Sequence, residues 1–188
     1  VADYSGALVY FACLGLGFML VEIILIQRFI LVLGHPVYAI SVILFSLLFF
    51  GGLGSYWSGR FGAQRKGLWL KIVLLALVLL LGAYNLGYPA LLRAFTGLSI
   101  EHRIGLTVVL LCPLGVLMGM PFPLGVSAVH RKEPRVVPWA WGVNATLSVL
   151  GSVLAAMLSI RFGFTAALVV GQLAYLTALG MAVIRPLD

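Results

Sequence analysis

Charged residues are scarce in this sequence, and the shortage excludes an ordinary water-soluble domain. Asp, Glu, Lys and Arg make up 9% of the 188 residues, whereas 63% are hydrophobic. Soluble domains are roughly one-quarter charged and about half apolar. A spanning helix needs about 20 mostly apolar residues, so the chain has room for about six crossings and no separate catalytic domain. We therefore predict an all-α, polytopic membrane helix bundle, with residues 1–188 forming one transmembrane domain.

The sequence also lacks the residues that metal sites and common enzymes require. Cys13 and Cys112 lie in separate apolar runs, with no CxxC and no Cys/His cluster. GxGxxG after a strand, GxxxxGK[ST], GxSxG and HExxH are all missing, which excludes the usual nucleotide, serine-hydrolase and zinc-protease sites. Both aspartates, Asp3 and Asp188, are terminal, which disfavours an intramembrane aspartyl protease. We predict no catalytic residue, no metal and no cofactor, and so not an enzyme.

Acidic residues are outnumbered by basic ones, five against twelve, but the basic residues do not indicate nucleic-acid binding. They form short clusters between apolar runs, where they set membrane orientation. Eight lie after the even-numbered spans: Arg60, Arg65, Lys66, Lys71, Arg131, Lys132, Arg135 and Arg185. Four lie on the other side: Arg28, Arg93, Arg103 and Arg161. This asymmetry predicts that both ends face the cytoplasm, in a multi-pass protein of a cell membrane, which we expect to be a bacterial inner membrane.

The apolar runs predict the span boundaries. The expected spans are residues 7–33, 37–55, 68–88, 104–129, 138–160 and 165–184. Gly34-His35-Pro36 is a strong helix stop after the first span. Pro89 to Arg103 mixes charged and apolar residues, so we expect a short interfacial segment there.

Glu22 is the leading candidate for function because it lies near the middle of the first span. A charged side chain at that depth costs several kcal/mol unless it is paired, protonated or facing a wet cavity. It either holds the bundle in register through a hydrogen bond or serves a proton, ion or ligand. Arg28 lies about 240° around the helix, on another face, and is expected to snorkel toward the outer interface.

The fourth span contains a predicted break. Gly115 and Gly119 have the GxxxG spacing of close helix packing. Pro121 and Pro123 follow directly, and because each lacks a backbone donor the helix must kink or break there. Freed carbonyls at membrane depth persist only when covered by protein or lining a cavity. The break either marks a binding site, as in transporters, or only bends the helix to fit the bundle.

The fifth span carries a stripe of small and polar residues. Its members are Asn144, Ser148, Gly151, Ser152, Ala155, Ala156 and Ser159. Close packing between helices is the ordinary purpose of such a stripe, whereas a transport path lined by Asn144 is the functional alternative. His35 precedes a proline at a turn and is expected at the interface, without a second histidine at helical spacing that would indicate haem.

Several longer strings together resemble the membrane part of bacterial spermidine-synthase-like membrane proteins. They are residues 15–22 (GLGFMLVE), 27–29 (QRF), 33–36 (LGHP), 52–55 (GLGS), 119–125 (GMPFPLG), 139–144 (WAWGVN) and 149–155 (VLGSVLA). The resemblance covers nearly the whole chain. It implies a membrane partner of a soluble domain similar to polyamine aminopropyltransferases, whose own cofactor glycines and catalytic aspartates do not occur in these residues. Residues 54–62 (GSYWSGRFG) also resemble a loop of major-facilitator transporters, without its usual acidic residue.

We therefore expect a membrane anchoring or assembly domain of a longer chain or a larger complex, with no catalysis of its own. Its partners would be the lipid bilayer, other membrane subunits or a fused soluble domain, and a homo-oligomer is compatible with the sequence. One alternative is a transport or binding module for a small cationic or amphiphilic ligand, with Glu22 as its countercharge. Another is a structural subunit of a membrane electron-transfer assembly.

Overall fold

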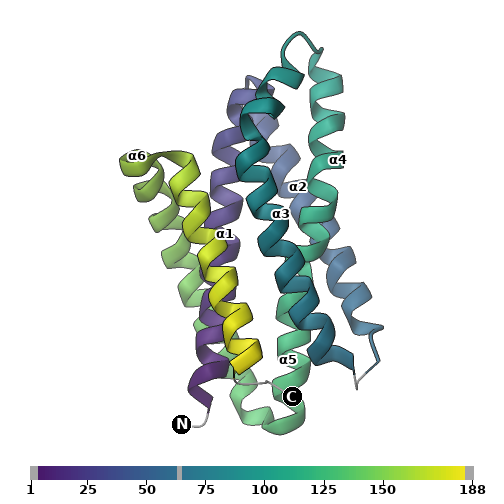
Figure 1. Ribbon diagram of the computed structural model, residues 1–188, viewed down its shortest axis with the longest axis vertical. Helices are drawn as coiled ribbons and strands as arrows, with labels where there is room; N and C mark the ends of the chain where they lie inside the picture. Colours follow the sequence, from purple (N-terminus) through teal and green to yellow (C-terminus); the bar gives the residue numbers. More distant parts are fainter. Residues whose placement is uncertain (1–3, 63–64, 185–188) are drawn as a thin grey trace.

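The structure, a computed structural model, describes residues 4–62 and 65–184, and over these residues it contains helices and no strand (Figure 1). The elements, in chain order, are α1 (Ser5–Leu33), α2 (Pro36–Gly59), α3 (Lys66–Phe95), α4 (Ile100–Gly119), α5 (Pro121–Lys132), the 3-10 helix η3 (Pro134–Val136) and α6 (Val137–Ile184). Five segments are long and apolar enough to cross a membrane, with α4 and α5 counted together as one and α6 as another. The chain is thus an all-α protein of the multi-pass membrane type.

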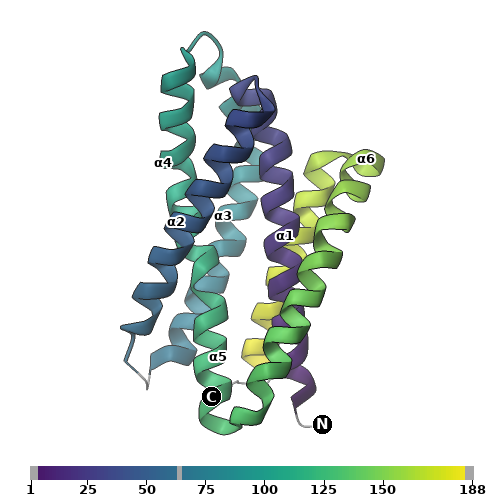
Figure 2. The ribbon, with the colours of Figure 1, turned by 180° about the vertical axis from the view of Figure 1, so that it is seen from behind.

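Helix α1 is the central helix of the bundle. The two arms of α6 pack against one side of it, and α2, α3 and the α4–α5 pair lie on the other (Figures 1 and 2). Its side chains Tyr10, Phe11, Leu20, Val21 and Ile24 are completely enclosed. The outer helices expose large apolar side chains instead, among them Phe45, Leu48 and Ile160. A surface of this kind suits lipid as the surrounding solvent.

The connection between α1 and α2 follows the predicted helix stop. Gly34 caps α1 in the left-handed conformation, with φ of 74°, and donates its amide to the carbonyl of Ile30. His35 is extended, and Pro36 begins α2, where its missing N–H costs nothing. The helix α2 then continues to Gly59, beyond the predicted end at Ser55, so the glycines at 51, 52 and 54 lie inside it.

The third and fourth predicted spans are longer in the structure than the sequence suggested. Pro89 lies inside α3, which runs on to Phe95, and α4 already begins at Ile100. The expectation of a separate interfacial segment from Pro89 to Arg103 is therefore wrong. The last turns of α3 and the first turn of α4 take up these residues, and Gly97, with φ of 85°, makes the turn between them.

The predicted break in the fourth span is present at Met120. The helix α4 ends at Gly119, and α5 begins at Pro121 with a new N-terminus. Pro113, by contrast, lies inside α4 without ending it. Two closely spaced prolines remove two helical hydrogen bonds from the same turn, whereas a single proline removes one.

The long helix α6 folds back on itself at Gly163. This residue has φ of 83° and ψ of 165°, which no helix contains, and Figure 1 shows a rising arm before it and a returning arm after it. The arms correspond to the predicted spans 138–160 and 165–184. The starts of α1 and α3 and the end of α6 lie at one end of the bundle, and the α1–α2 and α3–α4 turns lie at the other (Figure 2).

Candidate functional site

The helix break at Met120 opens onto a cavity of about 310 Å³ in the middle of the bundle. Four segments of the chain meet there. The lining residues are Leu14, Gly15 and Phe18 of α1, Ser55 of α2, Met118, Gly119, Pro121, Phe122 and Pro123 of the α4–α5 break, and Asn144, Ser148 and Tyr175 of α6. Of the residues selected from the sequence, the structure thus brings together Gly119, Pro121, Pro123, Asn144 and Ser148. Ser55 lies in two of the strings that carry the resemblances but was not among the predicted site residues, and no sequence pattern pointed to Tyr175.

Two helical hydrogen bonds are missing at the break. Pro121 and Pro123 cannot donate to the carbonyls of Leu117 and Gly119, four residues earlier. The hydroxyl of Tyr10 reaches across from α1 and donates to the carbonyl of Pro121, at 2.8 Å. Gly125 makes this reach possible, because a β-carbon there would stand 2.6 Å from the Tyr10 ring. The carbonyl of Pro121 at the break is thus satisfied by a side chain of α1.

Asn144 combines a packing role with a place in the cavity wall. Its amide nitrogen donates to the carbonyl of Phe11 at 3.1 Å, and Ser148 donates to the carbonyl of Asn144 at 2.8 Å. A β-carbon on Gly15 would collide with that same carbonyl of Asn144. The side-chain oxygen of Asn144 has no hydrogen bond to any described residue and remains available as an acceptor.

Glu22 lies one turn beyond the cavity on the same stripe of α1. Leu14, Phe18 and Glu22 follow one another at four-residue spacing, which places them on one helix face. The side chain of Glu22 is 7% exposed, and within the part of the chain that the structure describes no hydrogen bond or ion pair reaches its carboxylate. It lies near enough to Tyr175 of the cavity wall to interact with it electrostatically. The carboxyl group of Glu22 is thus buried with no hydrogen bond or ion pair to a described residue.

The remaining predicted residues lie outside the cavity. His35 is exposed at the start of α2 and its ring lies 5.7 Å from that of Tyr38. Gly151 and Ala155 are buried, and a β-carbon on Gly151 would stand 2.9 Å from the carbonyl oxygen of Leu16 in α1. Ser152 is half-buried and donates to the carbonyl of Val149. Gly115 packs against Phe50 of α2.

The prediction that Arg28 snorkels toward the outer interface is wrong. The residue does not snorkel, because it is the largest fully enclosed side chain of the described residues, at 1% exposure. Its Nη2 donates to Asn85 Oδ1 at 2.6 Å and to Thr165 Oγ1 at 3.1 Å, and its Cζ lies 4.5 Å from the centre of the Tyr88 ring. A signal was available in the sequence, since Asn85 and Tyr88 are polar residues on neighbouring turns of an otherwise apolar run.

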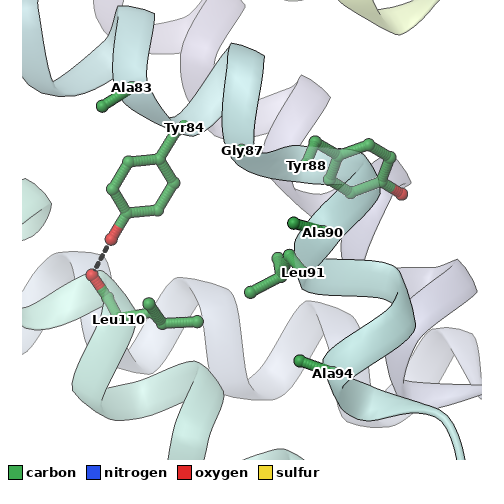
Figure 3. Close-up of a pocket in the computed structure, with 8 residues that line it drawn as sticks. All are labelled: Ala83, Tyr84, Gly87, Tyr88, Ala90, Leu91, Ala94 and Leu110. Atoms are coloured by element: carbon green, nitrogen blue, oxygen red, sulfur yellow. Dashed lines mark hydrogen bonds between the residues drawn. The ribbon is translucent and has the colours of Figure 1, made fainter.

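A second cavity, of about 410 Å³, lies between α3 and α4 and has a different character. Figure 3 shows it bordered by alanines, leucines and Gly87, with the Tyr84 hydroxyl donating to the carbonyl of Leu110 across it. Tyr88 stands at its edge with the hydroxyl turned away. This space offers no charged group, so it does not suit a polar ligand.

No family model, curated protein sequence or solved structure matches the chain. Within the described residues no three metal-ligating side chains come together. The cavity at the break offers acceptor oxygens, two serines, a tyrosine and a nearby carboxylate, and these groups are suited to binding a donor or a cation.

Proposed function

We propose that this chain is a membrane module that crosses the bilayer six times, with both ends in the cytoplasm, and that its central cavity binds a small ligand with a positively charged group. The carrying observation is that a broken helix and an available Asn144 oxygen line one cavity, with the carboxyl group of Glu22 one turn further along α1. Discontinuous helices at membrane depth place free backbone groups around substrates in transporters.

Size and charge both support a small cation as the ligand. A cavity of about 310 Å³ falls at the lower end of the range of ligand sites, about 300–1,000 Å³. The polar groups at or near the cavity accept hydrogen bonds or carry negative charge: they are backbone carbonyls, the Asn144 oxygen and a carboxylate. Keeping Glu22 ionised in the membrane costs free energy because its carboxylate is desolvated. That cost falls when an ammonium group binds beside it, because the attraction between the two charges offsets the desolvation.

The test is binding of organic ammonium ions to the purified protein in detergent. Tetramethylammonium and 1,4-diaminobutane are titrated by calorimetry against the unsubstituted chain, Glu22→Gln and Glu101→Gln. The last variant removes an exposed carboxylate from the start of α4 and serves as the matched control. We expect saturable binding that Glu22→Gln weakens about tenfold or more, which is about 1.4 kcal/mol, and that Glu101→Gln preserves. Equal affinities in all three proteins would contradict the proposal.

A second candidate, anchoring or assembly with a spermidine-synthase-like soluble domain, has its own support. The strings that carry that resemblance contribute the tightest helix contacts, between Gly54 and Val116 and between Gly119 and Gly51. This pattern is expected of a scaffold whose packing geometry matters most. The intact mass of the polypeptide from its native membranes decides the point: a mass well above 20.2 kDa, or a stoichiometric soluble partner, supports anchoring. A lone chain of that mass argues against it.

A further inference from the structure

Arg28 forms a polar cluster away from the central cavity, where α1, α3 and the returning arm of α6 meet. Asn85 and Thr165 accept hydrogen bonds from its Nη2, the Tyr88 ring covers it, and the Tyr88 hydroxyl donates to the Arg28 carbonyl at 3.0 Å. Asn85 also donates to the carbonyl of Thr165. These three side-chain partners of the guanidinium, Asn85, Thr165 and Tyr88, are all neutral.

The charge of Arg28 is therefore not balanced by the described chain. Its Nε is enclosed and has no hydrogen-bond partner. Among the described residues the acids are Glu22, Glu101 and Glu133, and none forms an ion pair with Arg28. An enclosed guanidinium without a counterion costs several kcal/mol in a membrane protein, and this cost falls when an anion binds.

The cluster lies close to the surface of the bundle, at the start of the returning arm of α6. Thr165 follows Gly163 by two residues and stands at the start of the returning arm of α6, where free backbone amides and the helix dipole add positive potential. Thr165 is exposed and Asn85 is half-buried, so two of the residues that contact the guanidinium reach the surface of the bundle. In the six-crossing arrangement proposed above, on which this step rests, the reversal between the two arms of α6 lies at the membrane interface, where lipid headgroups lie.

We propose that Arg28, Asn85 and the start of the returning arm at Thr165 bind a phosphate group. A guanidinium presents parallel N–H donors that match a phosphate, and the unpartnered Nε supplies one of them. The hydroxyl of Thr165 is free to rotate and donate to the same group. The phosphate belongs either to an anionic lipid headgroup or to the free ion, since both offer the same oxygens.

The test is native mass spectrometry of the full chain, released from nanodiscs with phosphatidylglycerol or phosphatidylcholine, together with titration of inorganic phosphate in detergent. The variants are Arg28→Gln, Arg28→Lys and Thr165→Val, with Arg93→Gln as a control that removes an exposed cation of α3. We expect the unsubstituted chain to retain phosphatidylglycerol preferentially or to bind phosphate. Arg28→Gln should weaken this at least about tenfold, as expected for losing hydrogen bonds to a charged group. Arg28→Lys and Thr165→Val should weaken it less, and Arg93→Gln should not change it.

The two sources give different results. Retention of the anionic lipid that free phosphate does not displace identifies a headgroup site, and phosphate binding without lipid preference identifies the free ion. The proposal is overturned if the unsubstituted chain shows neither binding, or if Arg28→Gln and Arg93→Gln behave alike. If Arg28→Gln fails to fold, the proposal is tested by comparing lipid retention in the unsubstituted chain and in Thr165→Val. Equal retention of phosphatidylglycerol by these two proteins would then overturn it. None of these outcomes depends on the ammonium site at Glu22.

Discussion

Gly119, the last residue of α4, lies directly against the backbone of Gly51 in α2. A β-carbon on Gly119 would collide with the carbonyl oxygen of Gly51. One turn away, Gly54 is in the same relation to the carbonyl of Val116. Glycines on both helices therefore let the backbones of α2 and α4 approach closely, and the break at Met120 begins beside one of these contacts.

Replacement of Gly119 by alanine should destabilise the bundle by about 1–3 kcal/mol, since the backbone of α2 must move to admit the methyl group. Gly52→Ala is the matched control, because a β-carbon at Gly52 meets nothing within 4 Å. Unfolding by SDS in mixed micelles, followed by circular dichroism, measures both. Equal midpoints for the two variants would show that α2 and α4 do not meet in this way.

Tyr10→Phe should destabilise the protein by about 1–3 kcal/mol, because the carbonyl of Pro121 loses its donor in an enclosed site. Tyr175→Phe is the control. Its hydroxyl is also on a buried ring, but it has no hydrogen bond to any described residue. The same unfolding measurement should separate the two variants, and a larger loss for Tyr175→Phe would speak against the contact at the break.

Much of the fold could be predicted from sequence because its signals are local. Apolar runs gave the crossing helices, Gly34 and Pro36 gave the first turn, and Pro121 with Pro123 gave the break. The failures have a physical cause too. Pro89 favours a helix end by its sequence alone, yet a proline late in a helix removes one hydrogen bond that neighbouring groups can replace.

The sites were less predictable because they depend on which helix faces which. Asn144 and Pro121 could be selected as unusual residues, but their meeting in one cavity with Ser55 and Tyr175 is a property of tertiary packing. Arg28 shows the same limit. A basic residue five positions before a helix end can snorkel or be enclosed, and only the approach of α3 and α6 decides between the two.

Gly163→Ala should destabilise the α6 reversal by about 1–3 kcal/mol, since its φ of 83° and ψ of 165° fall in a region that side-chain-bearing residues avoid. Gly180→Ala is the control in the same helix. It has a helical backbone and open space around its β-carbon, so alanine there should be neutral or stabilising by up to about 1 kcal/mol. Limited proteolysis near residue 163, together with the unfolding midpoint, should register the first change and not the second. Indistinguishable variants would mean that α6 does not reverse at this glycine.

The number of crossings depends on whether α6 passes the membrane once or twice. Single cysteines at Arg135, Phe162 and Ile184, in a background with Cys13 and Cys112 replaced by alanine, distinguish the two. If the arms cross separately, a membrane-impermeant maleimide added to intact cells should label Phe162→Cys, whereas Arg135→Cys and Ile184→Cys should react only after the cells are opened. This follows because the ends of α6 lie together, at the end of the bundle opposite its reversal (Figure 1). A single crossing would instead leave Phe162→Cys protected in the bilayer and place Arg135→Cys and Ile184→Cys on opposite sides, which would remove the six-crossing proposal.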